Sequence, residues 1–336
     1  MTEPVTTIGD SPTGPAIPGL RFRPFEPDSD YDELSSLTRA AALFDGVDIL
    51  ESANELRVEH AHVAGFDPRR DILVAEIDGT MSGFTETHVR VHGGRPVHHV
   101  DGSIAPAWRR HGLGRALLGW SHARAAAVAA GGVQDDQPHD LQSWVMGDQP
   151  GASALLESEG YSVIRYFHQM VRDLSEPIEP RGLPVGLEIR RVEPSDHRRI
   201  WDADVEAFRD HWNSPDRTEE DYLGWFAMPS LDTSLWRVAW DGPEVAGSVM
   251  TAIFAEENEI LGVQRGWLEH ISVRRPWRQR GLASALITEA MLGLRSIGMR
   301  EADLGVDSEN PNGAVRVYEQ LGFRVTRIAR LYARPL

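Results

Sequence analysis

The sequence contains no cysteine among its 336 residues. A chain without thiols has no disulfide, no thiol nucleophile and no cysteine-bound metal. Its histidines do not follow a zinc spacing such as HExxH, and no GxSxG elbow of a serine hydrolase is present. We therefore expect chemistry that needs no metal and no covalent acyl-enzyme.

The sequence also lacks a long hydrophobic run, because no apolar stretch approaches the roughly 20 residues that a helix needs to cross a bilayer. The first residues, MTEPVTTIGDSPTGPAIPG, carry neither the basic nor the apolar region of a signal peptide. Their proline, glycine and threonine predict a disordered arm over residues 1–18. We expect a cytoplasmic protein that does not bind membranes.

Basic residues are in deficit, which leaves a formal net charge of −17. Nucleic-acid binding requires a clustered basic surface, so we expect no nucleic-acid partner. An anionic ligand would need a local pocket of backbone N–H groups and arginines that works against the overall field.

The sequence contains one motif twice. RRHGLGRALL at 109–118 matches RQRGLASALI at 278–287, and other segments recur in the same order in both halves. LVAEIDGTMSGFTETHV at 73–89 and WRVAWDGPEVAGSVMTAI at 236–253 each predict a strand, a turn at Asp-Gly and a second strand. Two copies of one fold are the best account. We expect domains over residues 19–173 and 187–336, joined by a proline- and glycine-rich linker at 174–186.

Each copy predicts an α/β fold with at least one right-handed crossover. In the second copy, WLEHISV at 267–273 alternates as a strand, and an apolar stripe that ends at Gly298 predicts a helix. The loop between them presents unpaired N–H groups at the positive end of a helix dipole, where phosphate binds. Gly281 allows close approach, Ala283 keeps the next turn slim, and Arg278 and Arg280 can add charge-assisted contacts. A helix start whose glycine serves packing is the alternative reading of this loop alone.

The segment LGVDSENPNGAVRVYEQLGF at 304–323 favours the phosphate-binding interpretation of this loop. Together with the loop it resembles the GNAT superfamily of N-acetyltransferases, whose Arg/Gln-x-x-Gly-x-Gly/Ala motif matches Arg278, Gly281 and Ala283. The family's later motif matches Asn310, Ala314, Tyr318, Glu319, Gly322 and Phe323, with Gly313 as an extra residue after Asn310. The resemblance covers both halves, and tandem copies are similar to double acetyltransferases of the mycothiol synthase type.

This resemblance implies two tandem GNAT-like domains, each a mostly antiparallel twisted sheet with flanking helices and a coenzyme-binding βα crossover. It implies acetyl-CoA as the acyl donor and a small-molecule amine as the acceptor, in a monomer or a homodimer. It places the donor at Ile271, Ser272, Val273, Arg278, Gln279, Arg280, Gly281, Leu282, Ala283, Ser284, Asn310 and Asn312.

The resemblance also assigns proton transfer. Tyr318 would protonate the departing thiolate, for which a phenol is chemically suited; the alternative is an aromatic packed on an amphipathic helix. Glu269 would take the amine's proton directly or through water, although family members carry this glutamate two residues earlier, where Trp267 stands. An arginine-paired surface carboxylate is an equally good reading of Glu269.

The first half keeps Arg109, Gly112 and Gly114, so its loop could still hold CoA. It has Leu156 where the second half has Tyr318 and Val100 where it has Glu269. We expect no chemistry there.

The acceptor pocket is expected under residues 206–232, whose amphipathic His211, Trp212, Tyr222 and Trp225 could line it. Inward packing of these aromatics is the alternative. For the whole chain, a CoA-binding sensor without turnover competes with the acetyltransferase interpretation, and mycothiol synthase itself is a third possibility.

Overall fold

The computed structural model describes residues 12–131, 138–310 and 312–336, which form two compact units. Unit 1 comprises the chain up to Ile164 together with Arg330–Leu336, and unit 2 comprises Arg165–Ala329. The expected arm at 1–18 lies outside the described residues as far as residue 11, and beyond that Ile17 packs against the unit 1 cluster of Leu113, Leu117 and Trp120. Among the described helices, none is both long and apolar enough for a bilayer crossing.

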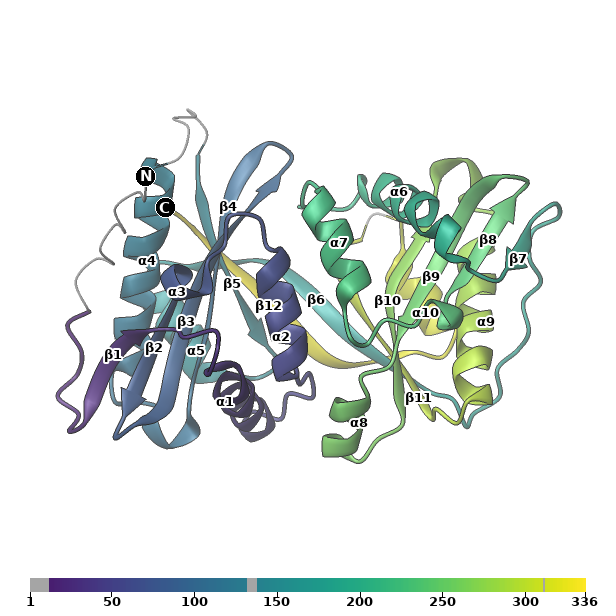
Figure 1. Ribbon diagram of the computed structural model, residues 1–336. Helices are drawn as coiled ribbons and strands as arrows, with labels where there is room; N and C mark the ends of the chain where they lie inside the picture. Colours follow the sequence, from purple (N-terminus) through teal and green to yellow (C-terminus); the bar gives the residue numbers. More distant parts are fainter. Residues whose placement is uncertain (1–11, 132–137, 311) are drawn as a thin grey trace. The chain divides into compact units, whose positions relative to one another are not determined.

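Unit 1 contains a mixed sheet with helices on both faces (Figure 1). Its strand order is β1-β2-β3-β4-β5 followed by the C-terminal part of β12. Tyr31 and Leu34 of α1 and Leu56 of α2 share one hydrophobic cluster, whereas Leu118 and Ala125 of α4 belong to another. The elements are β1 (Leu20–Pro24), α1 (Tyr31–Phe44), α2 (Ala53–His62), α3 (Pro68–Asp71), β2 (Ile72–Ile77), β3 (Thr80–His92), β4 (Arg95–Ile104), α4 (Leu113–Gly131), β5 (Asp140–Met146), α5 (Pro150–Ser158) and the start of β6 (Ser162–Asp173).

Unit 2 repeats this arrangement in the order β7-β8-β9-β10-β11-β6, followed by the N-terminal part of β12. In Figure 1, α6 and α7 lie on one face of its sheet and α9 on the other. Its elements are β7 (Glu188–Arg190), α6 (His197–Phe208), α7 (Glu219–Ala227), β8 (Arg237–Asp241), β9 (Glu244–Ala252), α8 (Ala255–Leu261), β10 (Arg265–Val273), α9 (Leu282–Ser296), β11 (Glu301–Asp307), α10 (Ala314–Gln320) and β12 (Arg324–Pro335).

The hairpins expected from the Asp-Gly turns are confirmed as β2–β3 and β8–β9. In the first, Asp78 and Gly79 both have positive φ, at 50° and 83°, which is the geometry of a hairpin turn that matches strand twist. The helix expected to end at Gly298 is confirmed as α9, whose Leu286, Ala290 and Leu294 are buried. The α/β fold class is thereby confirmed.

The division into units falls elsewhere than the expected domain boundary at 173/174. β6 pairs antiparallel with β11 from Phe167–Asp307 to Asp173–Glu301, so residues 165–173 belong to unit 2. The expected linker does not hang free either, because Leu174 is fully buried in the unit 2 core and Ile178 and Leu183 pack against it. A linker rich in proline and glycine can still carry apolar side chains that a core takes up.

Candidate active site

Two neighbouring parallel strands of unit 2 diverge. β10 and β11 pair only over Arg265–Trp267 and Glu301–Asp303. Beyond this point β10 continues to Val273 along β9, and β11 continues to Asp307 along β6. The ladder between them therefore ends halfway, and the backbone of Ile271, Ser272 and Val273 lies at the edge of the resulting opening. Those are the residues expected to bind the thioester carbonyl through N–H groups.

A β-bulge lies where the strands part. The register of β10 against β9 shifts between Leu268 and His270, with Glu269 as the extra residue. A bulge redirects side chains, and bulges often lie beside active sites. Trp267, where family members carry the glutamate, is buried and donates its Nε1–H to Glu257 at 2.9 Å. Glu269 itself is exposed.

The loop after β10 has the left-handed backbone that its sequence requires. Gln279 and Gly281 have φ of 61° and 81°, and Gly281 caps α9. Apart from Gly281 and its neighbours in the chain, no side chain of the described residues lies within 4 Å of the position that a Cβ on Gly281 would take. The first turn of α9, which includes Leu282, Ala283 and Ser284, therefore begins at an open surface, as phosphate binding at a helix N-terminus needs.

Arg278 is engaged within the protein. Its Nε donates to the Val273 carbonyl at 2.9 Å, and its other nitrogens donate to Asp210 at 2.6 Å and to the Ala207 carbonyl at 3.1 Å. This side chain ties the loop to the end of α6. Gln279 and Arg280 are exposed, so the Arg280 cation beside Gly281 faces solvent.

The C-terminal motif forms a tight turn into α10. The Asn310 side chain accepts the Asn312 N–H at 2.9 Å, and Gly313, the extra residue, caps the helix with a left-handed φ of 69°. Tyr318 on α10 is buried in the unit 2 core, with its ring 6.0 Å from that of Phe323. Burial raises the pKa of the Tyr318 hydroxyl above its ordinary value, so this group holds its proton at neutral pH.

A small cavity lies beside the bulge on the α7 side of the sheet, with a volume of about 60 Å³. Most of its wall is apolar. Its polar wall groups include Glu269, Trp225 and Thr251; Nε1 of Trp225 and Oγ1 of Thr251 are buried and have no hydrogen-bond partner within the described chain. Buried polar atoms are rarely left unsatisfied, so these two atoms indicate a bound water or a polar ligand. The wall is completed by Met228, Ser230, Leu231, Trp236, Met250, Ala252 and Phe254.

The other residues expected around the acceptor are divided. Trp225 lines the cavity, but Tyr222 packs against Trp201 and Phe226, with Arg198 4.0 Å from its ring centroid. Trp212 is 38% exposed, and Arg165 stacks on it. Trp212 lies between α6 and α7, and of the aromatic side chains on α7 only Trp225 lines the cavity.

His211 follows α6 and contacts Phe208, with ring centroids 4.3 Å apart. Burial lowers the pKa of His211. Sequence reasoning overlooked a second histidine nearby, His270, whose Nδ1 is 2.7 Å from Asp204 Oδ2. The signal was weak, since the two residues lie 66 positions apart and only the fold joins them.

Unit 1 repeats the loop in detail. Arg110 and Gly112 have φ of 67° and 91°, and Arg109 donates to the Ile104 carbonyl and to Asp45. Two features differ: Pro15 lies 3.3 Å from the position of a Cβ on Gly112, and Gly114 packs against Leu155. The repeated motif thus has the same backbone conformation in both units, but in unit 1 Pro15 of the segment before β1 lies against the loop.

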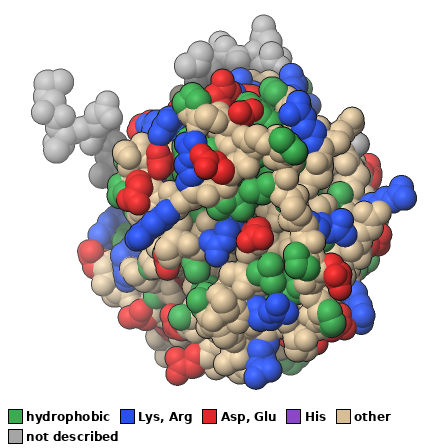
Figure 2. All heavy atoms as spheres, turned by 90° about the vertical axis from the view of Figure 1, so that its right-hand side faces the viewer, with side chains coloured by type: hydrophobic (Ala, Val, Ile, Leu, Met, Phe, Trp, Pro, Cys, Tyr) green, Lys and Arg blue, Asp and Glu red, His purple; other side chains and the backbone are tan. Residues whose placement is uncertain are grey.

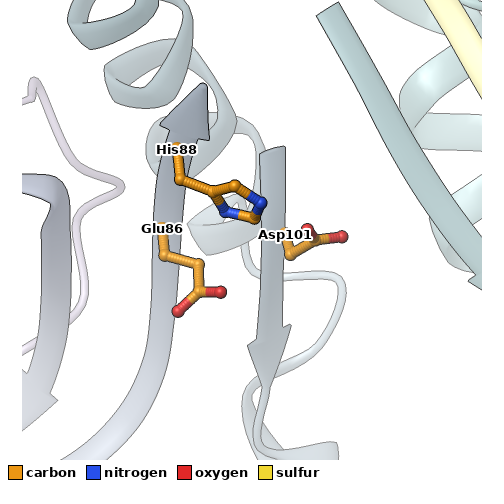
Figure 3. A group of neighbouring side chains, drawn as sticks. All are labelled: Glu86, His88 and Asp101. Carbon is orange, nitrogen blue, oxygen red and sulfur yellow. The ribbon is translucent and has the colours of Figure 1, made fainter. Parts of the chain in front are cut away.

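Unit 1 also contains the one group of side chains within the described ranges whose atoms lie close enough to share a metal ion. Glu86 and His88 on β3 and Asp101 on β4 have ligand atoms within 4.8 Å of one another (Figure 3). Glu86 is also 3.2 Å from Nε2 of the buried His60, and the rings of His88 and His99 stack 5.0 Å apart. Two carboxylates and an imidazole suit a divalent cation such as Mn²⁺ or Zn²⁺.

Comparison with known proteins agrees with this geometry. Residues 197–323 match the Acetyltransferase (GNAT) family. A mycothiol acetyltransferase of Geodermatophilus obscurus is 32% identical over 295 residues, covering 86% of this chain and 89% of that protein. A mycothiol acetyltransferase of Thermobispora bispora is 29% identical over 312 residues, covering 92% and 97%.

Solved structures share the whole fold. A GCN5-related N-acetyltransferase from Sphaerobacter thermophilus matches with a TM-score of 0.71 and 25% identity, covering 94% of this chain and 95% of that chain. A tandem GNAT protein from the clavulanic acid biosynthesis pathway matches with a TM-score of 0.66 and 18% identity, covering 94% and 98%. The chain therefore belongs to the GNAT family of acetyltransferases and is an N-acetyltransferase of the tandem form.

Proposed function

We propose that unit 2 transfers an acetyl group from acetyl-CoA to the primary amine of a small molecule by direct attack. The observation that carries this proposal is the cavity at the β10 bulge, which joins a carboxylate and two unpartnered polar atoms beside the point where β10 and β11 diverge. Donor and acceptor can then meet at one carbonyl carbon.

The residues present fit the donor. The open start of α9 at Gly281 offers N–H groups and a helix dipole to a diphosphate, and Arg280 adds a solvent-facing cation. The strand divergence offers backbone N–H groups of β10 to an extended arm and to the thioester carbonyl. When bound, acetyl-CoA supplies an activated acyl group, and every other requirement falls to the protein.

The protein's part is positioning and proton transfer. Glu269 attracts the ammonium form of the acceptor into the cavity and draws its proton directly or through water. The neutral amine nitrogen then forms a bond to the acyl carbon and loses a second proton to water, while the carbon–sulfur bond breaks and Tyr318 donates its hydroxyl proton to the departing sulfur. Proton transfer of this kind typically contributes 10²- to 10⁴-fold in rate.

Thiol release tests the proposal directly. The chain has no cysteine and no lysine, so it contributes neither a background thiol nor a side-chain amine that could be acetylated. Acetyl-CoA would be incubated with a panel of primary amines, and free CoA would be separated from acetyl-CoA by chromatography, because an acceptor that carries a thiol would react with a thiol reagent. We expect release with particular amines; tight acetyl-CoA binding without release for any amine would favour a sensor without turnover.

One acceptor has a specific reason to lead the panel. Relatives that align over most of this chain are named mycothiol acetyltransferases. We therefore place cysteinyl-glucosaminyl-inositol, the amine that mycothiol synthase acetylates, first. A specificity constant at least 100-fold above those of the other amines would identify this reaction, and a preference for another amine would assign a different acceptor.

A further inference from the structure

A buried carboxylate–imidazole pair in unit 2 has no part in the mechanism so far. The Nδ1 of His270 on β10 lies 2.7 Å from Oδ2 of Asp204 on α6. Both side chains are largely buried, with exposures of 13% for His270 and 4% for Asp204. Burying an ionisable pair costs desolvation free energy, which favours a functional role for this pair beside the cavity.

We propose that the base function assigned above to Glu269 is divided: Glu269 holds the acceptor ammonium, and His270, oriented by Asp204, replaces Glu269 as the group that takes its proton as attack begins. This inference rests on the proposed function of unit 2. It assigns Asp204 as a positioning residue and His270 as a catalytic residue.

The bulge brings the two groups together. Successive residues of a regular strand point to opposite faces, but a bulge relaxes this alternation. Glu269 lines the cavity, and the ring of its neighbour His270 lies 4.5 Å from that of Trp225, which also lines the cavity. Phe208, at 5.1 Å, contacts the same imidazole. The ring is therefore held between aromatics next to the acceptor.

The hydrogen bond decides which nitrogen reacts. With Nδ1–H donated to Asp204, the lone pair of neutral His270 is on Nε2, which is then the proton-accepting atom. Asp204 also stabilises the imidazolium that forms, as a buried aspartate does in a hydrolase triad. Its second oxygen, Oδ1, is buried and has no hydrogen-bond partner within the described chain, so Asp204 gains further from a positive charge on the ring.

The first half of the chain lacks this pair. Counting back from the matched arginines Arg278 and Arg109 by eight residues puts Asp101 opposite His270. Counting back from the matched partners Asp210 and Asp45 by six puts Arg39 opposite Asp204. The strand of unit 1 also pairs with β3 without a register shift from Arg95 to Ile104. The bulge and the pair thus occur in the unit that carries the tyrosine.

The step balances without another reactant. The acceptor ammonium gives one proton to Nε2 of His270, and the amine nitrogen forms the bond to the acyl carbon and loses a second proton to water. The carbon–sulfur bond breaks, and sulfur leaves with the proton of Tyr318. Both residues then exchange protons with water and return to their starting states.

The pH dependence of the reaction distinguishes His270 from Glu269. The groups that face the His270 region are Asp204 on α6, Glu269 on β10 and His211 after α6; Arg278, Asp210 and Asp307 act electrostatically on His211. The profile of kcat/KM against pH would be measured for the wild type and for His270→Gln, Glu269→Gln and Asp204→Asn. Asp202→Asn, an exposed carboxylate on the same helix, is the matched control.

For His270→Gln we expect kcat to fall 100-fold or more and the rising limb of the pH profile to vanish, with acetyl-CoA affinity unchanged. Glu269→Gln should raise the KM for the amine and keep the limb. Asp204→Asn should lower kcat about 10- to 100-fold, as loss of an orienting carboxylate does. A limb that survives in His270→Gln, or one that Glu269→Gln abolishes, would overturn the assignment.

A second measurement needs no acceptor. Nitrogen-15 spectra of the histidine rings in the acetyl-CoA complex should show His270 as the Nδ1–H tautomer, with the lone pair on Nε2, and Asp204→Asn should disturb this tautomer. A ring that carries its proton on Nε2 alone would refute the proposal even where wild-type turnover is normal. Absence of turnover would instead count against the function of unit 2.

Discussion

Arg278 lies in the expected loop, yet its partners are Asp210 and two backbone carbonyls. Arg109 has the equivalent partners in unit 1, so this arginine fixes the loop in both copies. At the scale of single residues, the family motif therefore located the loop correctly but did not predict that its arginine contacts the protein itself. The proposed acceptor contacts at Thr251 and Trp225 rest on the cavity that these residues line.

Tyr318 has the clearest single-residue prediction. Tyr318→Phe removes one hydroxyl from a buried ring, so the fold should persist while kcat falls about 100-fold or more, the typical contribution of proton donation. Turnover would be followed by thiol release and acetyl-CoA affinity by calorimetry. Tyr332→Phe, which alters a buried tyrosine of unit 1 instead, is the control. An unchanged kcat in Tyr318→Phe would remove the tyrosine from the mechanism.

Thr251 tests the acceptor cavity. Thr251→Val keeps the shape of the side chain but removes the unpartnered hydroxyl, so the free enzyme should be as stable as the wild type or more stable by about 1 kcal/mol. If the acceptor uses this hydroxyl, its KM should rise about 3- to 10-fold, since a neutral hydrogen bond contributes about 1 kcal/mol. Thermal melting and steady-state kinetics measure both quantities. A stabilised enzyme with an unchanged KM would place the acceptor elsewhere.

At the scale of elements, the loop before α9 and the loop before α4 share a backbone but not their surroundings. Gly281 is open, whereas Pro15 lies against Gly112. A helix N-terminus binds phosphate only where a ligand can reach its N–H groups. The two copies should therefore differ in affinity for the coenzyme.

Native mass spectrometry with acetyl-CoA can count the molecules bound to each chain. We expect one per chain at micromolar concentrations, lost in Gly281→Val, because a β-branched residue is strained at a φ of 81° and reshapes the loop. Gly112→Val, strained in the same way at a φ of 91°, should leave the count at one. A count of two in the wild type would show that the arm does not obstruct unit 1.

The helices and strands that the sequence predicted correctly are those that depend on local sequence patterns. Asp-Gly turns predicted the hairpins, and a stripe of leucines predicted α9, because both features depend on neighbours in the chain. The bulge at Glu269 and the pair of His270 and Asp204 could not be predicted, since each depends on strand register or on residues 66 positions apart. The same holds for residues 165–173, whose pairing with β11 is a long-range choice.

At the scale of the whole molecule, the pKa values of carboxyls matter more than their number. Basic and acidic side chains are interspersed over the face shown in Figure 2. Unit 1 contains two carboxyls with raised pKa values. Desolvation, and then the nearby Glu86 carboxylate, raise the pKa of the half-buried Asp101 to about 7. Desolvation of its carboxyl and the neighbouring Glu59 carboxylate raise the pKa of Glu51 to about 8.

These shifts predict how stability depends on pH. A carboxyl whose pKa is raised in the folded state contributes stability that is present at low pH and lost as the pH rises through the folded-state pKa. Histidines with lowered pKa values, such as His88 at about 4, act in the opposite sense but only below about pH 6.5. The free energy of unfolding should therefore fall between pH 6.5 and 8.

Calorimetric melting between pH 6.5 and 8 checks this expectation, and Asp101→Asn should flatten the dependence and raise the midpoint at pH 8 by a few degrees. Asp140→Asn, which alters a partly exposed carboxylate on the neighbouring β5 that pairs with Arg95, serves as the control. A wild-type midpoint that rises over this window would contradict the assignment of protonated acids to unit 1.

The membership of the last strand in unit 1 has a consequence for biosynthesis. Tyr332 is fully buried in a unit 1 cluster and donates to Glu157, and the Leu336 N–H bonds to the His139 carbonyl. When the ribosome has translated the chain up to Ala329, all residues of unit 2 have been synthesised. The last strand segment of the unit 1 sheet, Arg330–Leu336, has not yet been made. The half of the protein that is made first is therefore completed last, and a stop codon near the end of the message would damage the amino-terminal half.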